Sequence, residues 1–309
     1  LQNAAAHGAK GLLYYYGPIV NPNNDYIEGF IYSHIGRSVV DDIFAGSGKT
    51  YQETVVTIKK TLKPQSFKTG KVFTIKNKTE HHPEGLGYNL LAKVEGQDPV
   101  LKDEIIIIGG HLDHVGSCPD LMPGANDNAS AVAVMLGVAQ ALMKCEVKPK
   151  RTVLFAFFGA EEQGVKGSEF YLEHPMFDLN KTVGLINMDG VGSGDRIFVL
   201  AGKNFPWLYG PLEKANTSYI HRQMAANYWN NLTRPRLDAA RFADKNIPAL
   251  SLSVSGLELP YPTYHNTRDD PSIINPEILE DLARLLFVGV MELATVSPEK
   301  LRPQAGADN

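Results

Sequence analysis

The sequence has 309 residues, of which 43% are hydrophobic and 21% charged, which is the composition of a globular protein able to bury a large core. Its net charge of −4 and its pI near 6.2 argue against nucleic acid or an anionic membrane as a partner. No apolar run approaches the roughly 20 residues that a membrane-spanning helix needs. The two cysteines, Cys118 and Cys145, are too few for a disulfide framework, although a single bridge between them stays open.

The first elements are predicted to be short. "LQNAAAHGAKG" lacks an initiator Met and a signal peptide, so we expect a piece of a longer precursor. Residues 3–16 are predicted to hold a helix end and the strand "LLYYY", and residues 17–35 loops with the strand "GFIYS". A shift in composition near residues 62–70 predicts a domain boundary.

The segment "AGSGKT", residues 45–50, invites comparison with a phosphate-binding loop. That signature requires a glycine five positions before Gly48, where this chain has Ile43. The preceding "IGRSVVDDIF" also has a helical pattern rather than that of a buried strand. We therefore predict a glycine-rich turn between two helices.

The remainder of the chain alternates apolar runs with helical patterns. Residues 70–80 and 87–96 alternate in the manner of a β-hairpin. Nearly continuous apolar runs, typical of strands buried on both faces, follow at residues 104–110, 152–158, 182–188 and 248–254. The clearest helices are predicted at residues 128–144 and 275–294, the second with Asn275 as N-cap and Pro276 in its first turn. This alternation predicts an α/β fold, a mostly parallel mixed sheet with helices on both faces and a small N-terminal appendage.

Polar side chains stand immediately after three of the predicted strands. "IIIIGG" leads into His111 and Asp113, "FAFFGA" leads into Glu161 and Glu162, and "GLINM" leads into Asp189. Ligands of open α/β sheets bind at the carboxyl ends of the strands. These side chains are therefore expected to lie near one another.

Two further residues complete a candidate metal site. "PGANDNAS" places Asp127 before a predicted helix, and "YHNTRDD" places His265 in a late loop. Each residue alone has an ordinary explanation as a helix cap or a surface group. Together, imidazoles and carboxylates form a nitrogen and oxygen ligand set suited to zinc.

The segments "GGHLDHVG", "PGANDNAS", "FGAEEQG", "NMDG" and "YHNTRDD", in this order, resemble the motifs of the co-catalytic di-zinc aminopeptidase family. The family also contains glutamate carboxypeptidase-like enzymes, glutaminyl cyclases and inactive receptor relatives. The resemblance covers roughly residues 64 to 300. It implies the zinc exopeptidase fold, which is phosphorylase/hydrolase-like. Residues 1–45 more distantly resemble the back half of a protease-associated domain.

The resemblance implies a role for each matching residue. Two zinc ions would be bound, one by His111 and Asp189. The other would be bound by Glu162 and His265, and Asp127 would bridge the two. It also implies a cis peptide bond between Asp127 and Asn128.

The resemblance leaves Glu161 free to act as the general base on a metal-bridging water, and Asp113 to hold the imidazole of His111. Tyr264 is expected either to stabilise the oxyanion or to pack. The family's Ser-Asp-His-x-x-Phe pattern is "LDAARF" here, with Ala239 in place of the histidine, which puts a substrate contact in doubt. We interpret the remaining histidines, His114 among them, as structural or surface residues.

The function expected from the resemblance is that of a zinc-dependent aminopeptidase acting on peptides with a free N-terminus. Open alternatives are a carboxypeptidase or glutaminyl cyclase of the same fold, and an inactive binding module. The full set of five ligands argues against a glutaminyl cyclase, and the same set together with Glu161 argues against an inactive binding module. An extracytoplasmic location, periplasmic or secreted, rests on the resemblance alone.

The predicted organisation has four parts. Residues 1–45 form the partial protease-associated-like segment and residues 46–63 a connecting segment. Residues 64–300 form the zinc peptidase domain, and residues 301–309 form a C-terminal tail. The oligomeric state and the preferred N-terminal residue do not follow from the sequence.

Overall fold

The computed structural model describes residues 1–15, 26–76, 80, 82–117, 120–229, 237–255 and 263–297. The chain divides after Gly85 into two units. The second unit begins at Leu86, which differs from the start at residue 64 expected from the shift in composition. Cys118 lies outside the described residues, and Cys145 is a free cysteine.

The first unit contains a parallel pair of short strands and three helices. Strands β1 (Gly11–Tyr14) and β2 (Ile31–His34) confirm the two predicted strands. The helices of this unit are α1 (Gln2–Ala6), α2 (Arg37–Phe44) and α3 (Tyr51–Thr61). "AGSGKT" joins α2 to α3 with Gly46 and Gly48 at φ of 79° and 71°, which confirms a glycine-rich turn between helices.

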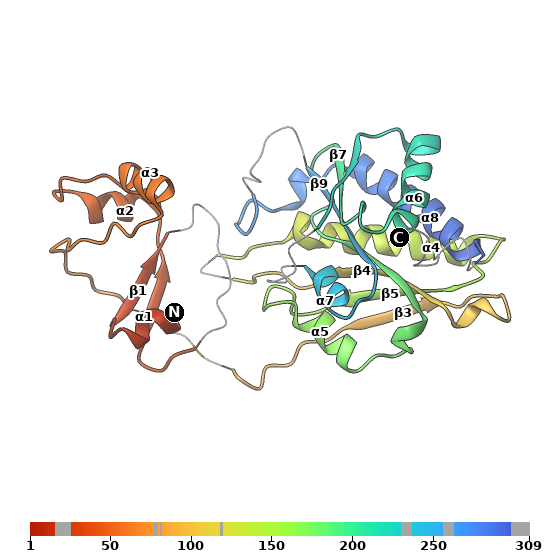
Figure 1. Ribbon diagram of the computed structural model, residues 1–309, viewed down its shortest axis with the longest axis horizontal. Helices are drawn as coiled ribbons and strands as arrows, with labels where there is room; N and C mark the ends of the chain where they lie inside the picture. The colour runs from red at the N-terminus through yellow and green to blue at the C-terminus, as the bar shows by residue number, and fades with distance from the viewer. Residues whose placement is uncertain are drawn as a thin grey trace, which may run out of the picture. The chain divides into compact units, whose positions relative to one another are not determined.

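The second unit is built on a mixed seven-stranded sheet (Figure 1). In spatial order its strands are β3 (Leu90–Val94), β5 (Thr152–Phe158), β4 (Ile105–His111), β6 (Thr182–Met188), β9 (Ala249–Ser255), β7 (Arg196–Leu200) and β8 (Met224–Ala226). The four central strands β5, β4, β6 and β9 run parallel and are the four apolar runs of the sequence. The mostly parallel mixed sheet is therefore confirmed.

The predicted β-hairpin of residues 70–96 is wrong. Residues 71–76 form no strand, and β3 instead pairs antiparallel with β5. Alternation of apolar residues does not identify a strand's partner, and an isolated two-stranded hairpin is marginally stable, whereas β3 joins a seven-stranded sheet.

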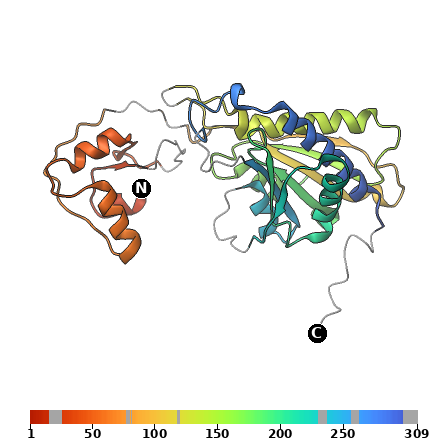
Figure 2. The ribbon, with the colours of Figure 1, turned by 90° about the horizontal axis from the view of Figure 1, so that it is seen from above.

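Helices cover both faces of the sheet, and the strands alternate between two cores. Ile106 and Ile108 of β4 pack in a core with α4 (Ser130–Lys144), α6 (Pro206–Ala215) and α8 (Pro276–Thr295). Figure 2 shows α4 and α8 side by side on one side of the sheet. Ile105 and Ile107 face the opposite core, where α5 (Lys166–Glu173) and α7 (Asp238–Asp244) lie.

The two long helices begin with identifiable signals. Asn275 caps α8 by accepting a hydrogen bond from the N–H of Glu277 at 3.0 Å, and Pro276 follows it, as predicted. α4 begins at Ser130 rather than at residue 128, because the backbone just before it is not helical at Asp127 (φ −114°, ψ 87°) and Asn128 (φ −138°, ψ 31°). Within the described ranges no helix has the length and apolarity to cross a bilayer.

Candidate active site and metal centre

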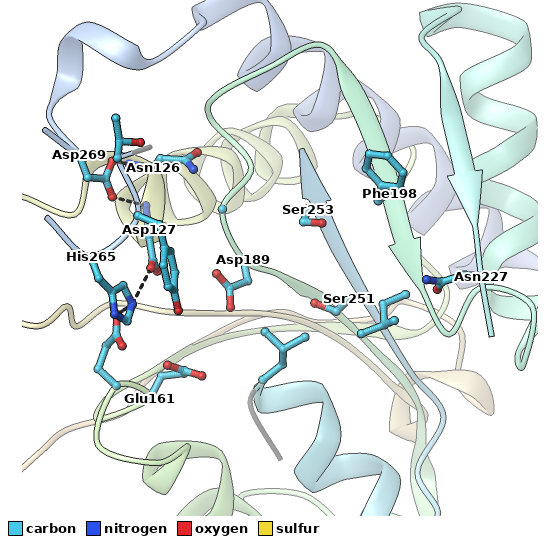
Figure 3. A pocket seen from close by; sticks show the side chains of 16 residues that line it. Asn126, Asp127, Glu161, Asp189, Phe198, Asn227, Ser251, Ser253, His265 and Asp269 are labelled. Carbon is cyan, nitrogen blue, oxygen red and sulfur yellow. Dashed lines mark hydrogen bonds and ion pairs between the residues drawn. The ribbon is translucent and has the colours of Figure 1, made fainter. Parts of the chain in front are cut away.

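The parallel central strands bring the predicted site residues to one edge of the sheet. His111 is the last residue of β4, Glu161 follows the end of β5, and Asp189 follows β6. Asp127 and His265 come from the loops before α4 and η5 (Pro271–Ile273). Figure 3 shows Asp127, Glu161, Asp189 and His265 around a common space.

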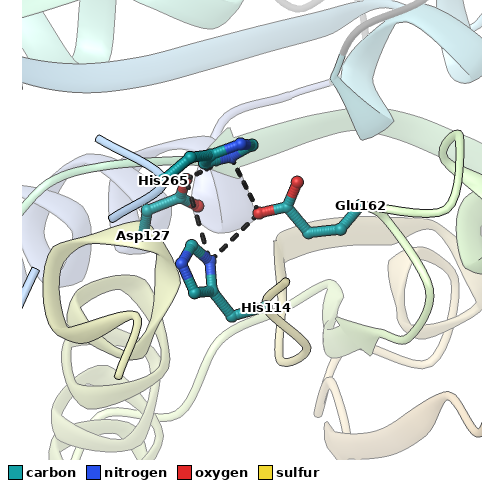
Figure 4. Close-up of side chains that lie close together, drawn as sticks. All are labelled: His114, Asp127, Glu162 and His265. Atoms are coloured by element: carbon teal, nitrogen blue, oxygen red, sulfur yellow. Dashed lines mark ion pairs between the residues drawn. The ribbon is translucent and has the colours of Figure 1, made fainter. Parts of the chain in front are cut away.

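Two groups of donor atoms meet at Asp127. In the first group, Nε2 of His111 lies 3.2 Å from Oδ1 of Asp127 and 3.8 Å from Oδ1 of Asp189. In the second, Nε2 of His265 lies 3.2 Å from Oδ2 of Asp127 and 3.0 Å from Oε1 of Glu162 (Figure 4). The structure therefore brings all five predicted ligands together, with one oxygen of Asp127 turned to each group.

His114 belongs to the second group, although the sequence analysis assigns it to the structural histidines. Its Nδ1 lies 3.0 Å from Oε1 of Glu162 and 4.0 Å from Oδ2 of Asp127. The available signal was its place in "HLDH", three residues after His111, at the edge where the other donors converge.

The position of Asp127 is fixed by backbone contacts. The peptide bond between Asp127 and Asn128 is cis, as the resemblance implies. The carboxylate of Asp269 accepts hydrogen bonds from the N–H groups of Asn126 at 2.7 Å and Asp127 at 3.0 Å. Asp269 is buried. The sequence analysis did not identify it as a site residue, although it stands within the "YHNTRDD" segment.

The segment that carries the two glutamates is held in a similar way. Oδ1 of Asp113 accepts a hydrogen bond from the N–H of Glu161 at 3.0 Å, and Oδ2 accepts one from the N–H of Glu162 at 3.2 Å. Nδ1 of His111 lies 3.0 Å from the carbonyl oxygen of Asp113 but 3.6 Å from its carboxylate. Asp113 thus contacts His111 mainly through its main chain, and its carboxylate orients the glutamate segment instead.

Burial and neighbouring charges shift the pKa values of the site residues. Burial raises the pKa of Glu161, and the nearby carboxylate of Asp189 adds to this, because each disfavours the ionised form. Burial opposes the charged form of His265, but Asp127 and Glu162 beside it raise its pKa to about 9. Burial likewise works against ionised Asp127, yet the imidazoles of His111 and His265 hold its pKa far below the usual range.

The donor atoms fit a bound cation. Both ring nitrogens of His114 and Oε1 of Glu162 are buried and have no hydrogen-bond partner among the described residues. Such groups are costly to bury unless something else satisfies them. Imidazole nitrogens and carboxylate oxygens at this spacing are the ligands that zinc takes, so the residues present fit the metal that the resemblance implies.

A cavity of about 580 Å³ opens beside the candidate metal site. Its acidic side chains include Glu161 and Asp189, and the hydroxyls of Ser251 and Ser253 on β9 also line it. Its apolar wall comes from three side chains on β7 and the start of the α7 segment: Phe198, Leu200 and Leu237.

The departure from the family's Ser-Asp-His-x-x-Phe pattern lies next to this wall. Ala239 is fully buried and packs in the core beneath the sheet, whereas Leu237 lines the cavity. Asp238 between them is buried, and neither of its carboxylate oxygens has a hydrogen-bond partner among the described residues. Burial raises the pKa of Asp238 to about 6.

Tyr264 lines the cavity with its ring stacked on that of His265. The ring centroids lie 3.8 Å apart with an interplanar angle of 21°. The contact fixes the imidazole plane of His265, so a packing role for Tyr264 has direct support in the geometry.

Comparison with known proteins agrees with this arrangement. Residues 89–290 match the family described as Peptidase family M28. An aminopeptidase from Aneurinibacillus sp. strain AM-1 is similar in structure, with 25% identity and a TM-score of 0.64, over 96% of this chain and 66% of that chain. BSAP, a zinc aminopeptidase from Bacillus subtilis, has 24% identity and a TM-score of 0.57, over 66% of this chain and 49% of its own.

Among curated proteins, leupeptin-inactivating enzyme 1 of Streptomyces exfoliatus is 37% identical over 108 residues, which are 35% of this chain and 23% of that protein. The matches span less than a quarter of the length of such curated relatives. The family match, by contrast, covers more than half of this chain and includes the residues that could hold a metal ion. The chain therefore belongs to peptidase family M28.

Proposed function

We propose that this protein is a zinc-dependent aminopeptidase that uses two zinc ions. The observation that carries the proposal is the pair of donor groups that share Asp127, with Glu161 beside them on the cavity wall. His111 and Asp189 would hold one ion, Glu162 and His265 the other, and Asp127 both. When bound, zinc supplies a Lewis acid that polarises the scissile carbonyl and lowers the pKa of water.

Glu161 has the position of the general base. Its carboxylate lines the cavity and, once a neighbouring cation favours the ionised form, can accept a proton from the attacking water. As the new bond from oxygen to the carbonyl carbon forms and the carbon–nitrogen bond breaks, Glu161 returns the proton to the leaving amine. The carboxylate of Asp113 accepts hydrogen bonds from the N–H groups of Glu161 and Glu162. It therefore holds the segment in which Glu161 would be the base and Glu162 a metal ligand.

The charge of the cavity favours recognition of a free amino terminus. The cavity is acidic, and of the described residues that line it none is a lysine or arginine. A carboxypeptidase would need a cation there for the substrate's terminal carboxylate. An α-ammonium group is attracted by the carboxylates instead, and the wall of Phe198, Leu200 and Leu237 suits an apolar first side chain.

The alternatives have weaker support. A glutaminyl cyclase uses a single zinc, whereas two donor groups meet here. An inactive binding module has no use for a buried Glu161 on the cavity wall. The stacking of Tyr264 on His265 supports a packing role for this tyrosine over oxyanion stabilisation. An extracytoplasmic location and the protease-associated-like character of residues 1–45 remain predictions from the resemblance.

The proposal is tested with zinc-loaded protein and paired chromogenic substrates. Leucyl-p-nitroanilide should be cleaved and its N-acetyl derivative should not. Peptides blocked at the C-terminus should be cleaved as well as free ones. The Glu161→Gln variant provides the background. Cleavage of the acetylated substrate, or a requirement for a free C-terminus, would reject the aminopeptidase assignment.

A further inference from the structure

The side chain of His114 lies close to the carboxylates of the candidate metal site, as a metal ligand would. Its side chain is only 9% exposed, and it stands on the segment that follows β4. Nδ1 approaches Oε1 of Glu162 to 3.0 Å and Oδ2 of Asp127 to 4.0 Å. Figure 4 shows His114 and His265 on either side of the carboxylates of Asp127 and Glu162.

The imidazole of His114 has no other evident role in the described structure. Its Nδ1 lies 3.0 Å from Oε1 of Glu162, a contact that, against the opposing effect of burial, lowers the pKa of that carboxyl group, whereas Nε2 has no hydrogen-bond partner among the described residues. A histidine that served only to orient Glu162 would need that single contact. Nδ1 of His114 also faces Oδ2 of Asp127, so it converges with Nε2 of His265 on the same two carboxylates, as the donors of one ion do.

The ring is held in place by its packing. A side chain at Gly124, which has φ of 67°, would meet Cγ of His114 at 2.6 Å, so the glycine lets the loop backbone lie against the imidazole. On another side the ring meets that of His265 edge to face, with centroids 5.4 Å apart. These contacts leave Nδ1 directed at the carboxylates.

We propose that His114 is a direct ligand of the ion held by Asp127, Glu162 and His265. This inference rests on the proposed function, since it adds a ligand to one of its two zinc sites. Donors 2.0–2.2 Å from one ion at tetrahedral angles lie about 3.3–3.6 Å apart. The four measured contacts of this group range from 3.0 to 4.0 Å around that spacing.

The extra ligand makes the two sites unequal. His111, Asp127 and Asp189 supply three donors, the number found in catalytic zinc sites that keep an open position. With His114, the other group supplies four donors, as in closed structural sites. The first group would then keep an open position for substrate or water, and the second would hold its ion more tightly.

The test is a titration of metal-free protein with Zn²⁺ and with Co²⁺, read by calorimetry and by the visible spectrum of cobalt. Wild type should bind two ions with distinct affinities. His114→Ala should weaken zinc binding at the tighter site by about 100-fold. Loss of a residue that only supports a metal ligand typically costs about 10- to 100-fold, and loss of a ligand should cost at least as much. It should also change the cobalt spectrum, because a nitrogen donor is lost.

His174→Ala serves as the matched control, since His174 is an exposed histidine at the end of α5 of the same unit. It should titrate as wild type does. An unchanged affinity in His114→Ala, or a weaker site with an unchanged cobalt spectrum, would overturn direct ligation. If wild type itself fails to bind two ions, the proposed di-zinc function is rejected instead, and the two failures are distinguishable.

Discussion

Oδ1 of Asp113 accepts a hydrogen bond from the main-chain N–H of Glu161 at 3.0 Å, which links the end of β4 to the turn after β5. The other carboxylate oxygen binds the next amide, that of Glu162. One side chain thus sets the directions of the proposed general base and of a proposed metal ligand. Loss of this carboxylate should disturb both without removing either.

We predict that Asp113→Asn lowers kcat by about 100-fold, toward the low end of what a positioned proton carrier contributes. The amide nitrogen of asparagine would face one of the two N–H donors, so at least one hydrogen bond is lost. Zinc content should fall only partly, because the ligands themselves remain. The measurement is turnover of leucyl-p-nitroanilide together with bound zinc.

Asp98→Asn is the control for this prediction. Asp98 likewise accepts hydrogen bonds from two main-chain N–H groups, those of Val100 and Leu101 at 2.9 and 3.0 Å, although both go to its Oδ1, and it lies outside the candidate metal site. It should leave turnover unchanged. Equal losses in the two variants would show that Asp113 affects general stability rather than the site.

Glu161→Gln and Glu162→Gln should give separable results. Glu161→Gln should keep zinc near the wild-type content while kcat falls by roughly 10²–10⁴. Glu162→Gln should weaken one metal site, and added zinc should restore part of its activity. Metal analysis alongside turnover distinguishes the two, and the reverse pattern would exchange the roles.

Asp238 should make the protein's stability depend on pH. Burial raises the pKa of Asp238 in the folded protein to about 6 from the ordinary 3.8. Its contribution to the free energy of unfolding is therefore fully present below pH 3.8 and is lost as the pH rises through 6. Asp238→Asn should therefore be more stable than wild type by about 2–3 kcal/mol at pH 7.5, with little difference near pH 4. Urea unfolding of metal-free protein at both pH values measures this.

The control for that prediction is Asp244→Asn, at the exposed end of the same helix α7. It should show no such gain at pH 7.5. An advantage for Asp238→Asn that is the same at pH 4 and pH 7.5 would mean that ionisation of the buried carboxylate is not its cause.

The apolar wall of the cavity should select the first side chain of the substrate. Leu200→Ala should lower kcat/KM for leucyl-p-nitroanilide by about 10-fold, because removing methylene groups from an apolar pocket is worth roughly 1–3 kcal/mol. Turnover of the alanyl substrate should change little. The exposed Leu136 of α4 provides the matched control variant, Leu136→Ala. A uniform loss with both substrates would place Leu200 outside the side-chain pocket.

The central strands and the α8 cap were predicted from the sequence pattern, and the five proposed ligands followed from the resemblance of the motifs to a known family. Continuous apolar runs report burial on both faces, and polar residues directly after such runs mark the carboxyl edge of a parallel sheet. These signals are local in the sequence, so they can be recognised without knowing which strands pair with one another. Strand β7 and the edge strand β8 carry no run of comparable length, because they have only five and three residues.

Only the tertiary structure decided how the polar residues divide their contacts. His111, Asp113 and His114 lie within four consecutive residues, yet they meet different groups: the carboxylates of Asp127 and Asp189, the amides of the glutamate segment, and Glu162. The failed hairpin has the same explanation, since β3 found its partner in β5. Sequence periodicity determines which residues are buried, whereas the direction of a side chain beyond a strand end depends on loops and registers fixed by residues far away in the chain.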